Sequence, residues 1–168
     1  ANLSVAGVQS TGGAGNDTLI DIENLTGSIF DDTLTGNTDA NVLEGLGGND
    51  ALIAAGGVDH LLGGPGADRL DGNAGYTYAD YSSANAGISA YLTWEAGNGG
   101  EAAGDHYIAI QGLVGSAYAD VLSGNELAIT VQAGAGNDWL FGREGQDTLG
   151  GGAGNDWIGD TSKLFLAG

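Results

Sequence analysis

The chain has 168 residues and a formal net charge of −19, with 22 Asp and Glu residues against three Lys and Arg. This acidity excludes nucleic acid as a partner, because that function requires clustered basic residues, and no apolar run is long enough for a membrane-spanning helix. Like charges at this density oppose compaction, yet 42% of the residues are apolar. A packed core therefore requires something that neutralises the acidic side chains, and a hard divalent cation is the obvious candidate.

A nine-residue repeat organises the chain. From Gly45, three consecutive units read GLGGNDALI, AAGGVDHLL and GGPGADRLD. The units at 27–35 and 36–44 keep the same frame, and it resumes at 133–141, 142–150 and 151–159. In each of these units the sixth place is Asp or Asn and the eighth is Leu or Ile. A fixed short period of this kind is typical of solenoid proteins.

This pattern resembles the RTX (hemolysin-type) calcium-binding nonapeptide repeat of secreted bacterial proteins. The resemblance implies an all-β fold, a parallel β-roll or β-solenoid. Each unit would contribute a Gly-rich turn and a short strand, two units would complete one coil, and calcium would bind in the Gly/Asp-rich turns.

A longer repeat lies on top of the short one. The segment Ile22–Ser28 matches Ile110–Ser116, an offset of 88 residues, and the same offset relates the aspartates of the two halves. We therefore expect two tandem modules, 1–80 and 81–168. The segment 76–100 would link them, and the alternation in Ile88–Trp94 predicts a strand.

The aspartate spacing predicts where calcium binds. Side chains at the eighth place should point inward as a thin aliphatic core, and so few aliphatic groups do not offset the ordering entropy of the glycines. If two units form a coil, sixth-place residues 18 apart lie side by side. The best pairs are Asp50 with Asp68 and Asp138 with Asp156, and Asp32 and Asp120 extend the two rows.

The opposite edge of the coils is less regular. There Asp59 has Asn41 on one side and Thr77 on the other, and Asp147 lies between Ile129 and Phe165. We expect weak or missing sites at this edge. Asp17 and Asp105 lie outside the frame of these rows.

Calcium takes about six to eight oxygen ligands, including backbone carbonyls. The resemblance implies that carbonyls at places one and three of one turn, and two and four of its neighbour, complete each site. We expect about four to eight bound calcium ions, and magnesium is disfavoured because it prefers a tight octahedron that retains water. The implied carbonyls belong to Gly45, Gly47, Gly64, Gly66, Ala133, Ala135, Gly152 and Gly154.

No catalytic motif is visible, so we expect no enzyme. The expected function is a calcium-binding structural or adhesive module, secreted to the outside or the surface of a Gram-negative cell, that folds on meeting calcium. One alternative is an accessory module for type I secretion within a larger RTX exoenzyme or toxin. Another is a subunit of a filament or surface layer that stacks head to tail, since the 88-residue frame begins and ends within a module.

Two aromatic residues could form a surface that binds a partner molecule. Trp139 and Trp157 occupy the seventh place of units 18 residues apart, and should lie as neighbours on an exposed face. They would suit a protein interface or a polysaccharide platform. They would equally suit a cross-strand pair that stabilises the sheet.

Overall fold

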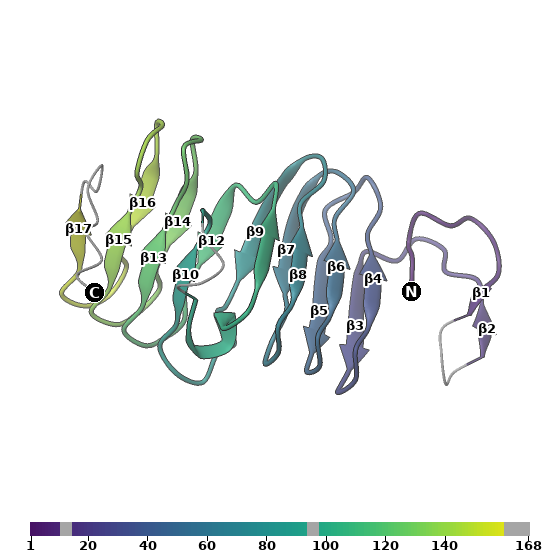
Figure 1. Ribbon diagram of the computed structural model, residues 1–168. Coiled ribbons are helices and arrows are strands. Elements are labelled where there is room, and N and C mark those ends of the chain that lie inside the picture. Colours follow the sequence, from purple (N-terminus) through teal and green to yellow (C-terminus); the bar gives the residue numbers. More distant parts are fainter. Residues whose placement is uncertain (11–14, 94–97, 160–168) are drawn as a thin grey trace.

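The computed structural model describes residues 1–10, 15–93 and 98–159. Most of this chain winds into a single β-solenoid in which short strands follow one another around successive coils (Figure 1). The long strand ladders are parallel, and the antiparallel pairing of named strands is confined to β1 (Gln9–Ser10) with β2 (Asn16–Asp17). The predicted parallel β-roll is thereby confirmed. In the described part of the chain, no helix is long and apolar enough to cross a membrane.

One face of the solenoid is a continuous seven-stranded sheet, here called the long sheet. It runs through both modules without a break, because β9 of the first pairs with β12 of the second. Its strands are β3 (Asn24–Ser28), β5 (Val42–Leu46), β7 (Val58–Leu62), β9 (Tyr76–Asp80), β12 (Gly112–Val114), β14 (Thr130–Gln132) and β16 (Thr148–Gly150).

The other face is divided between two four-stranded sheets. The N-terminal short sheet contains β4 (Thr33–Thr35), β6 (Ala51–Ile53), β8 (Arg69–Asp71) and β11 (His106–Ile108). The C-terminal short sheet contains β10 (Ser89–Tyr91), β13 (Val121–Ser123), β15 (Trp139–Phe141) and β17 (Trp157–Gly159). In the regular coils, paired residues are 18 apart, as in Leu52 with Leu70 and Leu122 with Leu140.

The two short sheets meet at one larger coil, residues 81–111, here called the joint coil. It contains β10, the 3-10 helix η3 (Gly100–Ala102) and β11, so it starts one short sheet and finishes the other. The regular coils extend to Asp80, and the predicted linking segment 76–100 therefore starts too early. The predicted strand Ile88–Trp94 is present only in part, as β10, because Leu92 and Thr93 form a turn, and Trp94 lies outside the described residues.

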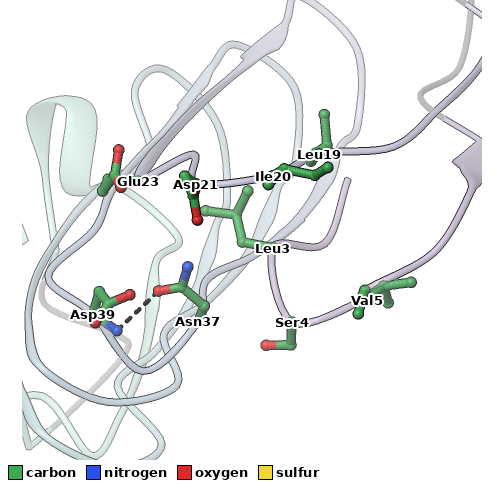
Figure 2. Close-up of a pocket in the computed structure, with 10 residues that line it drawn as sticks. Leu3, Ser4, Val5, Leu19, Ile20, Asp21, Glu23, Asn37 and Asp39 are labelled. Carbon is green, nitrogen blue, oxygen red and sulfur yellow. Dashed lines mark hydrogen bonds between the residues drawn. The ribbon is translucent and has the colours of Figure 1, made fainter.

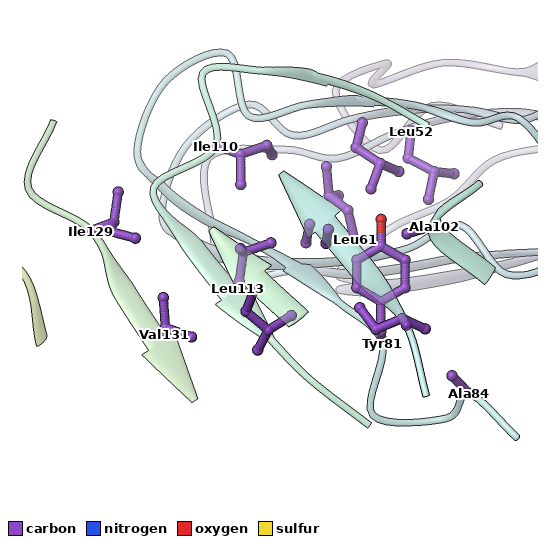
Figure 3. Packing of buried hydrophobic residues seen from close by; sticks show 14 of the residues in the cluster. Leu52, Leu61, Tyr81, Ala84, Ala102, Ile110, Leu113, Ile129 and Val131 are labelled. Carbon is purple, nitrogen blue, oxygen red and sulfur yellow. The ribbon is translucent and has the colours of Figure 1, made fainter. Parts of the chain in front are cut away.

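The core is the predicted row of eighth-place side chains inside the coils. Leu43, Leu52, Leu61 and Leu70 are fully buried in the first module, and so are Leu122 and Leu140 in the second. Figure 3 shows the part of this cluster around Leu113, Val131 and Tyr81. The expectation is wrong for Ile158, which is 55% exposed. Its strand β17 ends the C-terminal short sheet, so no further described strand pairs over it.

Candidate metal sites in the turns

The sixth-place side chains form a hydrogen-bonded row along one edge of the coils, here called the aspartate ladder. Oδ1 of Asp50 accepts the N–H of Asp32 at 2.8 Å, and Oδ1 of Asp68 accepts that of Asp50 at 2.8 Å. In the second module, Asp138 and Asp156 accept the N–H groups of Asp120 and Asp138 at 2.9 and 3.1 Å. The structure therefore brings together both sets of residues that the spacing pairs, and each carboxylate ties its coil to the one before.

The second carboxylate oxygen is left without a partner. Oδ2 of Asp50, Asp59, Asp68 and Asp138 is buried and has no hydrogen-bond donor within reach. These side chains are at most 2% exposed. A buried polar atom without a partner is costly, and a buried charge more so. A cation in contact with each of these oxygens would offset the cost of burying it.

The pKa values of these carboxyl groups also show that burial disfavours their charged form. Burial raises the pKa of Asp50, Asp59 and Asp138, and the hydrogen bond from the preceding coil offsets this only in part. Burial, with smaller contributions from the charges of Asp105 and Asp50, raises the pKa of Asp68 to about 7. A cation next to these carboxylates would favour their charged form.

Where glycine opens a turn, its Cβ position leaves no room for a side chain. A Cβ at Gly45, Gly63 or Gly151 would collide with Oδ2 of the aspartate five residues later. The carboxylate therefore folds back over the start of its own turn. This packing explains why glycine opens these units and aspartate follows at the sixth place.

Backbone carbonyls line the interval between successive turns. Between turns 45–50 and 63–68, a Cβ at Gly64 would meet the Leu46 carbonyl and one at Gly66 would meet that of Gly48. From the later turn, the Gly63 carbonyl lies 2.7 Å from the Cβ position of Gly45, and the Pro65 carbonyl accepts the Gly48 N–H at 3.3 Å. Carbonyls at places two and four thus face the next turn, and those at places one and three face the previous one.

This geometry corrects the carbonyl set implied by the resemblance. The implied set combined places one and three of the earlier turn with two and four of the later one, whereas the structure has the reverse. The carbonyl of Gly45 faces Gly27 and that of Ala133 faces Gly115, each in the preceding turn. In the second module the interval between turns is lined instead by the carbonyls of Gly134, Gly136 and Ala153. The carbonyls of Gly45 and Ala133 were thus assigned to the wrong interval. The ligand roles of the other implied carbonyls, those of Gly47, Gly64, Gly66, Ala135, Gly152 and Gly154, stay predictions.

The opposite edge of the coils has part of the same geometry as the aspartate ladder. Asp59 is fully buried, its Oδ1 accepts the Asn41 N–H at 2.8 Å, and its Oδ2 is one of the unpartnered oxygens. Asp147 is half-buried and accepts the Ile129 N–H at 3.2 Å. Thr77 pairs with Asp59 in the sheet, as expected, and Phe165 lies outside the described residues.

Two residues in these rows were not predicted. Asp105 follows Asp68 in the ladder, and its Oδ1 accepts the Asp68 N–H at 2.9 Å. Gln111 occupies a sixth place on the opposite edge, where its Oε1 accepts the Thr77 N–H at 2.8 Å. Counting nine residues back from the sixth-place Asp120 would have found Gln111. Asp17, by contrast, belongs to the antiparallel strand β2 outside the three solenoid sheets.

The donor set suits calcium better than a transition metal. Within the described ranges, no three His, Cys, Asp or Glu side chains gather closely enough to hold a metal ion. A cation in a turn would therefore be bound by one or two carboxylates together with several carbonyls. That all-oxygen set fits calcium, whereas zinc prefers nitrogen and sulfur ligands.

Two further surface features lie away from the turns. Trp139 and Trp157 are 53% and 48% exposed on the C-terminal short sheet, with ring centroids 5.0 Å apart and planes tilted by 40°. Phe141 is buried beside them. A pocket of about 300 Å³ lies near the N-terminus, where Asn37 accepts the Asp39 N–H at 2.9 Å (Figure 2). None of the predicted site residues lines that pocket.

Comparison with protein families gives a match over more than half of the chain. The model of the RTX calcium-binding nonapeptide repeat matches in four copies, over residues 11–20, 26–61, 53–76 and 130–158. These ranges contain ladder residues from both modules, including Asp50, Asp68 and Asp138, and leave out 77–129. No curated protein matches the chain significantly.

Proposed function

Since the chain belongs to the RTX calcium-binding nonapeptide repeat family, we propose that it is a calcium-binding β-roll module whose folding is driven by calcium outside the cell. The observation that carries this proposal is the set of buried Oδ2 atoms without partners on Asp50, Asp59, Asp68 and Asp138. Each belongs to a turn whose neighbours present backbone carbonyls, so a calcium ion there would satisfy both at once.

Charge couples this binding to folding. Without a cation, a net charge of −19 opposes the compact state, and the thin aliphatic core does little to resist it. When calcium binds, it neutralises the carboxylates that the coils bring together, and its binding free energy becomes folding free energy. The chain would be open where calcium is scarce and would fold where calcium is abundant.

This behaviour supports a secreted, structural or adhesive role over catalysis. An open chain suits export by type I secretion, as expected for the family in Gram-negative bacteria. The acidic side chains of the aspartate ladder lie in the turns at the edge of the coils, where calcium would occupy them, and the sequence contains no catalytic motif. We therefore propose that the chain has no enzymatic activity of its own.

The test is a calcium titration of metal-free protein followed by far-UV circular dichroism, with magnesium as the control cation. Strand signal that appears with calcium and not with an equal concentration of magnesium supports the proposal. A chain that has its full strand signal in chelator at neutral pH would overturn it.

Replacing Asp138 by Asn is expected to raise the calcium concentration at half-saturation by about tenfold or more, equivalent to about 1.4 kcal/mol. The amide keeps the volume and one acceptor, but it replaces the unpartnered oxygen with a neutral N–H donor. Glu126→Gln removes the same charge from an exposed position and is the matched control. If both variants shift the titration equally, only net charge matters and the ladder has no specific role.

The exposed tryptophans favour a second function, adhesion through the C-terminal short sheet. Large aromatic side chains at half exposure are typical of protein contact surfaces. The rings of Trp139 and Trp157 are tilted and not coplanar, which suits interlocking with another protein surface better than stacking on flat sugar rings.

We expect self-association in calcium that depends on these rings. The double change Trp139→Ala and Trp157→Ala should lower the weight-average mass seen by sedimentation velocity at high protein concentration. Tyr118→Ala is the control, because Tyr118 is similarly exposed, at 49%, outside the C-terminal short sheet. A parent protein that stays monomeric over the whole concentration range would rule out self-adhesion.

A further inference from the structure

The aspartate ladder continues into the joint coil through a residue outside the nine-residue frame. Asp105 is fully buried, and its Oδ1 accepts the Asp68 N–H at 2.9 Å. The His106 N–H donates to the Asp68 carbonyl at 2.7 Å, just as the Arg69 N–H donates to that of Asp50 at 2.8 Å. Asp105 therefore stands one ladder step beyond Asp68, although the two are 37 residues apart in the chain.

The difference at this step is the second carboxylate oxygen. At Asp50, Asp68 and Asp138, Oδ2 is buried without a partner. At Asp105, Oδ2 accepts a hydrogen bond from the Tyr81 hydroxyl at 2.6 Å. The Tyr107 hydroxyl lies 2.6 Å from that of Tyr81, and it must be the donor there because the Tyr81 proton is already used. A chain of two hydroxyls occupies the position where the other steps lack a partner.

Tyr81 is held firmly in this position. Its side chain is 2% exposed, and its N–H donates to the Val114 carbonyl of the long sheet at 2.9 Å. Figure 3 shows the ring among the buried aliphatic side chains, with the hydroxyl directed away from Ala84. Burial raises the pKa of both Tyr81 and Tyr107 above the usual range, so both hydroxyls remain proton donors.

The backbone before Asp105 also differs from a repeat turn. Gly100–Ala102 forms the 3-10 helix η3. A Cβ at Gly100, five residues before Asp105, would lie 2.8 Å from the Gly87 carbonyl and near Ile88, not against the carboxylate. The glycine cradle seen at Gly45 and Gly63 is therefore missing here. Consistent with this, the family match does not cover residues 77–129.

We propose that the hydroxyls of Tyr81 and Tyr107 replace the cation at the Asp105 step, so that the joint coil connects the two calcium-dependent halves without binding calcium itself. This inference rests on the proposed calcium binding at the other ladder steps. The tyrosines act as positioning residues for the solenoid, and the Asp105 step that they complete takes up no calcium ion of its own.

The experiment is to count the calcium ions bound per chain by equilibrium dialysis and to measure the thermal midpoint in saturating calcium. Tyr81→Phe should lower the midpoint, because a buried carboxylate oxygen loses its donor. The ion count should stay that of the parent, or rise by one if calcium enters the vacated position. A lower ion count would show that Tyr81 belongs to a calcium site, and an unchanged midpoint would show that its hydroxyl has no role. Either result would overturn the inference.

Two further variants keep the test decisive. Tyr107→Phe removes only the outer hydroxyl, and should give a smaller fall in the midpoint with the parent's ion count even if Tyr81→Phe does not fold. A lost ion in Tyr107→Phe would again contradict the inference. Asp138→Asn should bind fewer ions than the parent. If it does not, the proposed calcium ladder itself is wrong, and that failure is distinct from the failure of the tyrosine substitution.

Discussion

Replacing Gly66 by Ala should destabilise the protein by about 3 kcal/mol or more, even in saturating calcium. The new methyl group would meet the carbonyl oxygen of Gly48 in the preceding turn. That oxygen is backbone and cannot move aside without separating the two turns. Since the same carbonyl lines the interval between them, the substitution should weaken calcium binding as well as packing. Urea unfolding at fixed calcium measures the first effect and a calcium titration the second.

Gly47→Ala is the matched control for this change. Gly47 belongs to the turn on the other side of the same interval, but the nearest atom to its Cβ position is the Pro65 carbonyl oxygen at 3.7 Å, an ordinary contact. Both variants remove one glycine from one turn, so they change the entropy of the unfolded chain similarly. Equal destabilisation by the two variants would mean that Gly66 does not lie in close contact with the Gly48 carbonyl.

The aspartate ladder was predictable because the 18-residue spacing alone determines which sixth-place residues are neighbours. The 18-residue spacing places Asp50 beside Asp68 and Asp138 beside Asp156 once two units form a coil, and the backbone N–H of each coil then finds the next carboxylate. The inward row of leucines follows from the same period and the alternation of a strand. Ile158 departs from that row only because its strand is at the end of a sheet.

Other parts of the site depend on information that spacing does not contain. Asp105 enters the ladder because the joint coil lengthens one turn of the solenoid, so its distance from Asp68 in sequence is set by an insertion and not by the repeat. The direction of each carbonyl depends on how the peptide planes are oriented within a turn. The family resemblance implied that carbonyls complete each site, but it placed those of Gly45 and Ala133 in the wrong intervals.

Acid should partly replace calcium in folding this chain. Burial raises the pKa of Asp50, Asp59 and Asp138 above the ordinary value of 3.8, and raises that of Asp68 to about 7. Between about pH 4 and about pH 7 the folded, metal-free chain binds more protons than the unfolded chain, so the stability of the folded state falls as the pH rises. The contribution is fully present below about pH 4 and is lost by about pH 7. Circular dichroism of metal-free protein should therefore show more strand at about pH 5 than at about pH 7.5.

Calcium and protons would then compete for the same oxygens, and binding should release protons and tighten as the pH rises. Asp68→Asn separates this mechanism from a general effect of net charge. The amide resembles the protonated carboxyl, so without calcium at about pH 7.5 this variant should keep more strand signal than the parent, and its signal should change less with pH. In calcium the order should reverse, because the variant has lost a ligand. A variant that is less folded than the parent in both conditions would show that the Asp68 carboxylate stabilises the coil without a cation, contrary to the role assigned to its unpartnered oxygen.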